Sequence, residues 1–303
     1  MQRTHADILL LIVAAIWGAA FVAQKAAMDV MGPLTFTAVR FLLSALVILP
    51  FVLHEFKVKD GSAGRPPVAD IVIMCAAFCF SAIVQQVGVI HTSVTNAGFL
   101  TGLYVVFVPL ICGIIFREKI PQRIIPAALL AVIGAWLLSG GSTGILNGIS
   151  YGDGLILMCA AGFGLHVAMI GRIMQKWKRP LLLCLIQHIV ITLVSGIAAP
   201  FFESPALSQI TDALWAILYA GVLSGGIAYS LQMVAQQYTP SSDSAILLSA
   251  EAVFAALFGW MLAGDKLGLV AWTGCAIILA AIAIVEAWPH LSQRFSKTQS
   301  ISS

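Results

Sequence analysis

The chain of 303 residues is 60% hydrophobic and only 10% charged, with a net charge of +3 and a mean hydropathy of +0.99. A soluble domain usually carries about 25% charged residues, so an aqueous fold has no means of hiding this much apolar surface. The composition therefore excludes an ordinary soluble protein and predicts an integral membrane protein that sits in a lipid bilayer.

Ten apolar segments are long enough to cross a bilayer, which takes roughly 20 residues for about 30 Å of hydrocarbon. They lie at approximately 7–27, 34–54, 68–90, 94–116, 121–139, 151–172, 179–199, 210–232, 241–263 and 268–288. The sequence thus predicts an all-α integral membrane protein with ten transmembrane helices. The connections are too short for a separate soluble domain, and we expect coil only at 57–67 and after residue 288.

Basic residues gather on one side of this topology. With the N-terminus in the cytoplasm, the cytoplasmic segments hold all 16 Lys and Arg residues except Lys25, Arg40 and Lys266. This positive-inside asymmetry predicts a multi-pass protein of the inner (cytoplasmic) membrane with both termini cytoplasmic. The same asymmetry explains the net charge of +3, so this charge does not indicate that the protein binds nucleic acid. The first apolar run begins at Asp7 and has the length of a span, so we interpret it as a helix and not as a cleavable signal.

Two stretches half the chain apart are alike. Residues 91–119 align without gaps on 238–266 at an offset of 147, and residues 7–18 align on 153–164 at an offset of 146. In the longer match the identities are Thr92/Thr239, Leu100/Leu247, Val106/Val253, Phe107/Phe254, Leu110/Leu257 and Lys119/Lys266. In the shorter match both copies begin with Asp and end with Gly. An ancient duplication is the simplest explanation.

This duplication predicts the organisation of the chain. Each half holds five spans, and an odd number forces the two copies to cross the bilayer in opposite directions, as in many secondary transporters. We therefore expect two inverted five-helix repeats, at 1–145 and 146–290, followed by a cytoplasmic tail at 291–303.

Three stretches carry a resemblance to a known family: residues 17–21 (WGAAF), 96–101 (NAGFLT) and 249–260 (SAEAVFAALFGW). With the order of its segments, nearly the whole chain resembles the EamA-type drug/metabolite transporter superfamily. Its members usually have Pro after the Glu of the last stretch and Gly-Glu at that helix's end, whereas this chain has Ala252 and Asp265. The resemblance implies the family's fold, one EamA-type repeat in each half, and the carriage of small polar or amphipathic metabolites, often outward.

Glu251 is the clearest candidate for a functional side chain. Its helix is predicted to enter from the cytoplasm near Ser241, which places Glu251 about 15 Å deep, close to the midplane. A carboxylate there is a proton relay, a counter-charge for a substrate amine, or a structural hydrogen-bonding group. At the offset of 147 it aligns with Tyr104, at similar depth. We expect the two to face each other across a pseudo-two-fold axis, where inverted-repeat transporters place their sites.

Four more side chains are candidates for the same midplane site. Trp17 falls at the centre of its span, where it is either core packing or the wall of a cavity. Gln85 and Gln86 are consecutive and point to different faces, so their amides bond a ligand or a neighbouring helix. Histidine is the side chain whose ordinary pKa is near neutral, so we interpret His166 either as a proton shuttle or as a hydrogen-bonding partner of another helix.

Lys25 and Arg40 fall on the outer halves of the first two predicted helices. Long cations near a span end usually reach to the interface, which is one interpretation of Lys25. Arg40 lies about 9 Å inside its span and requires a partner or an aqueous vestibule. We predict that the two residues supply the charge of an outer vestibule and that Arg40 attracts an anionic group such as a carboxylate.

The sequence lacks the motifs of other chemistries. It has no P-loop, no HExxH and no G-x-S-x-G, its acids show no metal-ligand spacing, and its six cysteines lie in predicted spans without a CxxC pair. We therefore predict no catalytic residues, no cofactor and no metal.

The expected function is secondary transport and not enzymatic catalysis. The first hypothesis is a small amphipathic metabolite, an amino acid or related compound, moved outward by alternating access, with proton coupling through Glu251 as one mode. The alternatives are a carrier or exchanger of a vitamin, nucleobase or drug-like metabolite and, more distantly, a membrane enzyme or a scaffold without flux. The expected partners are the small-molecule substrate, the bilayer and, with coupling, protons; both a monomer and a homodimer fit.

Overall fold

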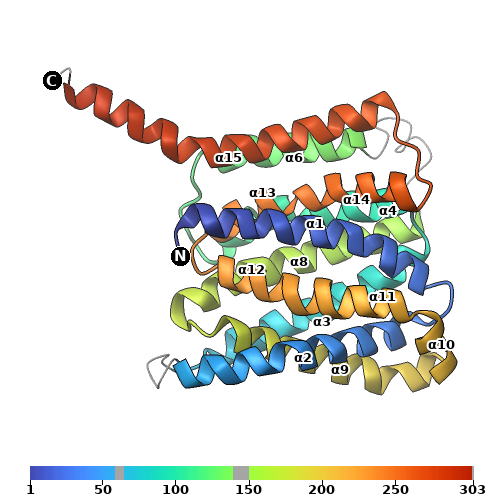
Figure 1. Ribbon diagram of the computed structural model, residues 1–303. Coiled ribbons are helices and arrows are strands. Elements are labelled where there is room, and N and C mark those ends of the chain that lie inside the picture. The colour runs from blue at the N-terminus through green and yellow to red at the C-terminus, as the bar shows by residue number, and fades with distance from the viewer. Residues whose placement is uncertain (59–64, 139–149, 302–303) are drawn as a thin grey trace.

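The computed structural model describes residues 1–58, 65–138 and 150–301, and within these ranges it is helical with no strand (Figure 1). The helices are α1 (Arg3–Ala27), α2 (Pro33–Val58), α3 (Val68–Ile90), α4 (Val94–Gly102), α5 (Tyr104–Leu110), α6 (Ile124–Leu138), α8 (Tyr151–Lys176), α9 (Pro180–Phe202), α10 (Leu207–Asp212), α11 (Leu214–Leu218), α12 (Tyr229–Ala235), α13 (Ser241–Leu248), α14 (Ala250–Leu262) and α15 (Leu269–Ile301). Two π-helical segments, η1 (Ile111–Ile115) and η2 (Tyr219–Ala228), complete the described helices.

The expectation of an all-helical membrane protein is confirmed. Eight helical segments are long and apolar enough to cross a membrane, and two shorter apolar helices, Ile124–Leu138 and Leu269–Val285, fall within the other two predicted spans. The count of ten spans stays a prediction. The expectation of coil after residue 288 is wrong, because α15 is helical as far as Ile301. Each residue added to an existing helix gains one backbone hydrogen bond, except a proline such as Pro289, and this segment has no glycine to end it.

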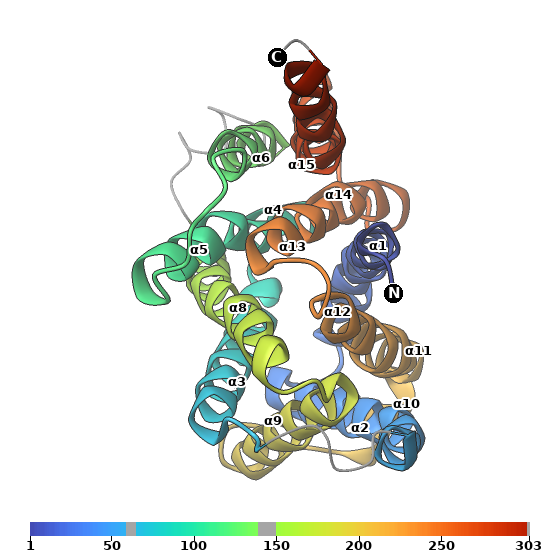
Figure 2. The same ribbon diagram turned by 90° about the vertical axis from the view of Figure 1, so that its left-hand side faces the viewer.

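The helices form a bundle with one pair set apart. In the end-on view of Figure 2 most helices surround a centre, while α6 and α15 pack against each other at one edge. Inside the bundle α1 packs on α14, α3 on α8, and α2 on α9. Each of these contacts joins a helix from the first half of the chain to one from the second half.

Several predicted spans are not continuous α-helices. The span predicted at 94–116 is divided into α4, α5 and η1, and the one at 241–263 into α13 and α14. The first break is at Leu103, directly before Tyr104, and the second is at Ser249, two residues before Glu251. At the offset of 147 these breaks fall within one residue of each other. Both candidate residues therefore lie next to an interruption in the middle of a span.

Aligned residues of the two halves make the same hydrogen bond twice. Thr92 Oγ1 donates to Asp153 Oδ1 at 2.7 Å, and Thr239 Oγ1 donates to Asp7 Oδ1 at 2.6 Å. In each bond the threonine comes from one half of the chain and the aspartate from the other. Lys25, near the end of α1, binds the carbonyl of Thr92 at 3.0 Å, whereas Asp7 lies near the start of α1. The two bonds are thus about 27 Å apart along α1, at opposite ends of the bundle.

A close helix contact is also made twice. Gly18 of α1 meets α14 so closely that a Cβ built on it lies 2.8 Å from the backbone carbon of Phe254. A Cβ on Gly164 of α8 lies 2.5 Å from Cβ of Phe107 in α5. Gly18 aligns with Gly164, and Phe254 aligns with Phe107. The residues that match in the sequence are thus those that meet across the two halves in the structure.

Candidate functional site

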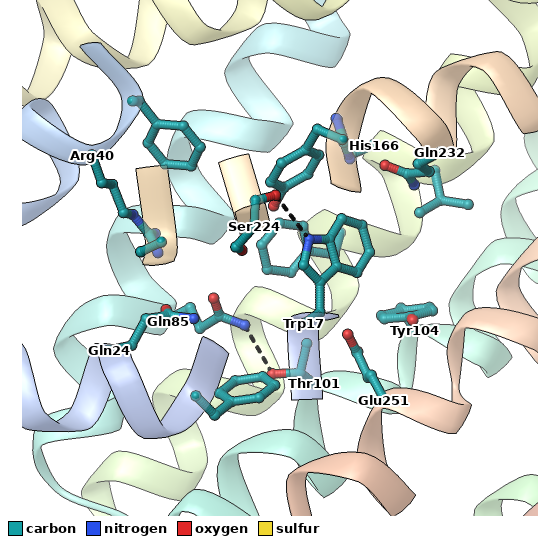
Figure 3. Close-up of a pocket in the computed structure, with 16 residues that line it drawn as sticks. Trp17, Gln24, Arg40, Gln85, Thr101, Tyr104, His166, Ser224, Gln232 and Glu251 are labelled. Carbon is teal, nitrogen blue, oxygen red and sulfur yellow. Dashed lines mark hydrogen bonds between the residues drawn. The ribbon is translucent and has the colours of Figure 1, made fainter. Parts of the chain in front are cut away.

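A cavity lies inside the bundle, between helices of both halves (Figure 3). Its polar lining consists of Gln24, Arg40, Gln85, Thr101, Tyr104, His166, Ser224, Tyr229, Gln232 and Glu251, and its apolar lining includes Trp17, Phe21, Phe41, Phe163 and Val167. The volume of about 40 Å³ holds roughly three water molecules. A larger molecule enters only if the surrounding helices move apart.

Glu251 and Tyr104, the aligned pair, both line this cavity. Glu251 is in the first turn of α14 and is 3% exposed, and Tyr104 begins α5 and is 2% exposed. Figure 3 shows the two side chains next to each other. Neither the Tyr104 hydroxyl nor Oε1 of Glu251 has a hydrogen-bond partner among the described residues. The structure therefore brings the two groups close enough to interact with each other and with a ligand in the cavity.

Trp17 forms an aromatic wall of the cavity. Its indole Nε1 donates to the carbonyl of Ser224 in η2 at 3.3 Å, and its ring centroid lies 4.8 Å from that of Tyr229. Because the indole N–H already has an acceptor, Trp17 presents mainly apolar ring surface to the cavity. The π-helical η2, a kind of segment often found at functional sites, supplies that acceptor.

His166 lines the cavity but already has a protein partner. One ring nitrogen lies 2.8 Å from Oε1 of Gln187, and the ring stacks on Phe78 with centroids 4.9 Å apart. The hydrogen bond to a neighbouring helix is therefore present, as one of the two interpretations of this residue requires. The fixed ring still forms part of the wall.

The consecutive glutamines have different surroundings. Gln85 lines the cavity, and its Nε2 donates to Thr101 Oγ1 at 3.1 Å. Gln86 is not among the residues that line it; its amide donates to the backbone carbonyl of Gln24 at 3.4 Å. Of the two, Gln85 alone is part of the cavity lining.

Lys25 and Arg40, the two cations predicted for an outer vestibule, lie in different places in the structure. The Lys25 ammonium binds the carbonyls of Val89 and Ile90 at 2.8 Å in addition to that of Thr92, at the C-terminal end of α3, where a positive charge is favourable. Arg40 instead lines the central cavity and is 4% exposed. Lys25 thus ties two helices together, and Arg40 belongs to the same cavity as Glu251.

Sequence reasoning missed several polar lining residues. Gln24, Thr101, Ser224 and Gln232 line the cavity, and none of them was among the candidates. Gln232 is fully buried, and neither its amide oxygen nor its nitrogen has a partner among the described residues. A buried amide is a rare side chain in hydrocarbon, so Gln24 and Gln232 carried a signal in the sequence that Thr101 and Ser224 lack.

No metal site is evident among the residues that the structure covers, where no three His, Cys, Asp or Glu side chains cluster. The six cysteines are free and buried. The chemistry that this arrangement offers is therefore reversible binding of a small molecule by one carboxylate, one guanidinium, several amides and hydroxyls, and an aromatic wall.

Known proteins are similar to this chain over almost its whole length. The sequence is 36% identical over 288 residues to an uncharacterized transporter of Archaeoglobus fulgidus, covering 94% of this chain and 87% of that protein. It is 24% identical to the uncharacterized transporter YwfM of Bacillus subtilis, covering 96% of each. The WAT1-related protein At3g02690, chloroplastic, of Arabidopsis thaliana is 23% identical, with 89% of this chain and 66% of that protein covered.

The fold is shared with a solved structure as well. A crystal structure superimposes with a TM-score of 0.75 at 16% sequence identity, covering 93% of this chain and 98% of the other. The sequence profile of the EamA-like transporter family matches twice, at residues 4–140 and 150–287. Together with the apolar helices and the central cavity, these matches show that the chain belongs to the EamA-like transporter family and is a membrane transporter.

Proposed function

We propose that this protein is a secondary transporter that moves a small amphipathic metabolite across the membrane by alternating access. In this proposal, ten helices form two inverted five-helix repeats, residues 1–145 and 146–290, followed by the tail. The central cavity is the substrate site, and it opens in turn to each side. Its walls come from a single chain, so a monomer is sufficient, and a homodimer is compatible.

The pairing of Tyr104 with Glu251 is the observation that supports the proposal most directly. The two residues align in the duplicated sequence, lie beside breaks in their spans, and meet in one cavity lined by both halves. Transporters built from inverted repeats bind substrate at the repeat interface, near discontinuous helices. The crossed contacts of Gly18 with Phe254 and of Gly164 with Phe107 agree with the two-fold relation that this mechanism requires.

The orientation in the membrane is part of the proposal. Arg3 and Arg123 both pair with Asp243 at the end where α1 begins, and Lys176 binds Asp70 at the last turn of α8. We place this basic end in the cytoplasm of the cell, which puts both termini there and the protein in the inner membrane.

An amino acid or related compound, moved outward, is the first substrate hypothesis. Glu251 supplies the counter-charge for an amine, and Trp17 supplies an aromatic surface for an apolar group. A vitamin, a nucleobase or a drug-like molecule is the alternative for the same aromatic cavity. In a coupled mechanism Glu251 also carries the proton, because a carboxylate buried near the midplane is a natural proton acceptor.

Transport by the purified protein in liposomes tests the proposal. Vesicles with the protein should exchange labelled amino acids faster than vesicles without it, and a proton gradient should drive uphill accumulation. Glu251→Gln should abolish the accumulation while exchange persists if the carboxylate carries the proton. Glu118→Gln, which changes an exposed glutamate, is the matched control and should retain both activities.

Two results would overturn parts of this proposal. Full uphill accumulation by Glu251→Gln would remove proton coupling through this residue. Absence of flux for amino acids, vitamins, nucleobases and amphipathic drugs alike would contradict the transport function assigned to the cavity.

A further inference from the structure

Arg40 is a buried cation without an anionic partner among the described residues. It and Arg179 are the two buried Lys or Arg side chains of the described residues, and Arg179 donates to the backbone carbonyl of Glu55 at 3.0 Å. For Arg40 no hydrogen bond or ion pair to any described residue is present, and its Nε is buried without an acceptor. A guanidinium brings five N–H donors, so this arrangement is costly unless a ligand completes it.

The buried acids leave no candidate partner except Glu251. Four acidic side chains are buried in the described part of the chain: Asp7, Glu55, Asp243 and Glu251. Asp7 accepts from Thr239, Asp243 lies 2.8 Å from Arg123, and Glu55 accepts the backbone N–H of Leu182 at 3.1 Å. Glu251 lines the same cavity as Arg40 but forms no ion pair with it. The cavity thus holds one cation and one acid that form no ion pair with any described residue.

The surroundings hold the Arg40 guanidinium in place without neutralising it. Its Cζ lies 4.6 Å from the ring centroid of Phe41 and 5.2 Å from that of Phe36. Such cation–π contacts fix the group but leave its N–H donors unused. Figure 3 shows Arg40, Gln24 and Ser224 on one side of Trp17, with Tyr104 and Glu251 on the other.

We propose that Arg40 is the subsite for the carboxylate of the transported molecule, and that Gln24 and Ser224 complete this subsite. A guanidinium binds a planar carboxylate through two parallel hydrogen bonds. The opposite side of the cavity, with Glu251, then takes an amine or another donor of the same molecule. The substrate class is a small zwitterion or acid with an apolar group against Trp17; this assignment rests on the proposed transport function.

A phosphate group is the other ligand that a guanidinium binds well. Two observations favour the carboxylate. The carboxylate of Glu251 lies in the same small cavity, and it repels a doubly charged phosphate more strongly than a singly charged carboxylate. The described lining also has no lysine and no arginine other than Arg40, so it supplies one positive charge to balance the ligand.

Matched ligand pairs test the subsite. Purified protein in detergent is mixed with each proteinogenic L-amino acid and, separately, with its carboxyl amide, which keeps the amine and the side chain but lacks the carboxylate. Inorganic phosphate and acetate complete the panel. In the wild type at least one amino acid should raise the melting temperature more than its amide does.

The Arg40→Gln variant should lose that difference. We expect it to bind the amino acid about 10-fold to 100-fold more weakly, the usual scale for losing hydrogen bonds to a charged group, while binding of the amide stays the same. Arg40→Lys should restore part of the affinity. Arg65→Gln, a change to an exposed arginine outside the cavity, should behave like the wild type.

A purely structural role for Arg40 gives a different result. The unliganded Arg40→Gln protein should melt at the wild-type temperature or above it, because an unpaired buried charge is removed. A large drop in its melting temperature would indicate a structural cation instead. The proposal is also overturned if no amino acid stabilises the wild type more than its amide, or if phosphate alone stabilises it.

The same vesicles separate this proposal from the transport function. Equal flux of amino acid and amide by both the wild type and Arg40→Gln would refute the carboxylate subsite and leave the transporter intact. A carboxylate-dependent shift in melting temperature without any flux would support the carboxylate subsite and contradict the transport function.

Discussion

Replacing Gly18 by alanine tests a close backbone contact between the two halves. A Cβ at this position lies 2.7 Å from the backbone nitrogen of Ala255 and 2.8 Å from the backbone carbon of Phe254. Ordinary contact begins at 3.4 Å, so α14 has to move by more than half an ångström. The obstacle is helix backbone, which does not rotate away as a long side chain does.

The expected cost follows from these distances. Overpacking of this kind destabilises a protein by about 1–3 kcal/mol. Replacing glycine by alanine inside a helix stabilises the helix by up to about 1 kcal/mol, which offsets part of that loss. We predict that Gly18→Ala is less stable than the wild type by about 1–2 kcal/mol. Gly164→Ala should cost less, because only one atom, Cβ of Phe107 at 2.5 Å, is too close to the new methyl group and the backbone there is 3.5 Å away.

Gly154→Ala is the matched control. It lies in the same helix as Gly164, and a Cβ on Gly154 meets no atom within 4 Å. The assay is thermal unfolding of the three purified variants in one detergent, with transport measured in parallel. Since Gly18 adjoins Trp17 and α14 carries Glu251, the Gly18 variant should also lose flux. If Gly18→Ala is as stable as Gly154→Ala, the close approach of α1 and α14 is wrong.

Two more predictions concern single polar groups. Thr239→Val removes the buried donor to Asp7 and should lower the free energy of unfolding by about 1–3 kcal/mol. Thr92→Val removes a half-buried bond and should lower it by less than about 1 kcal/mol. Equal melting temperatures for the two variants would contradict this ranking. Tyr104→Phe removes a hydroxyl that has no partner among the described residues, so the melting temperature should stay within the error of the wild type while flux falls; unchanged flux would place Tyr104 outside the substrate site.

The helices and the centre of the site were predictable from the sequence for a simple reason. Apolar runs are long because hydrocarbon is thick, and residues in the middle of a run lie at the midplane whatever the packing. Trp17, Tyr104 and Glu251 were selected by this depth argument, and the structure places all three in the cavity lining. The duplication added the pairing of Tyr104 with Glu251, which depth alone does not give.

Rotation about the helix axis was the part that the sequence did not provide. Depth placed both Lys25 and Arg40 in an outer vestibule, yet Lys25 turns toward the end of α3 while Arg40 turns toward the centre. Gln85 and Gln86 differ in the same way. Which face of an apolar helix meets its neighbours depends on small residues and close backbone contacts, and these became clear only once the helices were packed.

Thr101 and Ser224 were missed for another reason. Small hydroxyl residues are frequent where membrane helices pack, so their presence in a span does not distinguish a site from a contact. Ser224 also contributes its backbone carbonyl, which accepts from Trp17, and a backbone group has no signature in the sequence. The π-helical turn that contains it was equally invisible.

The duplication explains why a nearly symmetric frame can hold an asymmetric site. Two separate identical subunits would place the same residue on both sides of a two-fold axis, whereas fused halves diverge independently. Here the aligned positions carry a phenol, Tyr104, and a carboxylate, Glu251.

The same divergence is visible at the two ends of the bundle. The bond of Thr239 to Asp7 is buried, and Arg3 links Asp7 to Asp243. The bond of Thr92 to Asp153 is half-buried, and Lys25 binds the backbone carbonyl of Thr92 beside it. Alternating access requires the two ends to open in turn, and unequal closing contacts bias that equilibrium toward one state. The opposite end is also closed by contacts between the halves, of Asp265 with Thr95 and of Glu203 with Thr35, so under the proposed mechanism a substrate has to supply free energy to open either end.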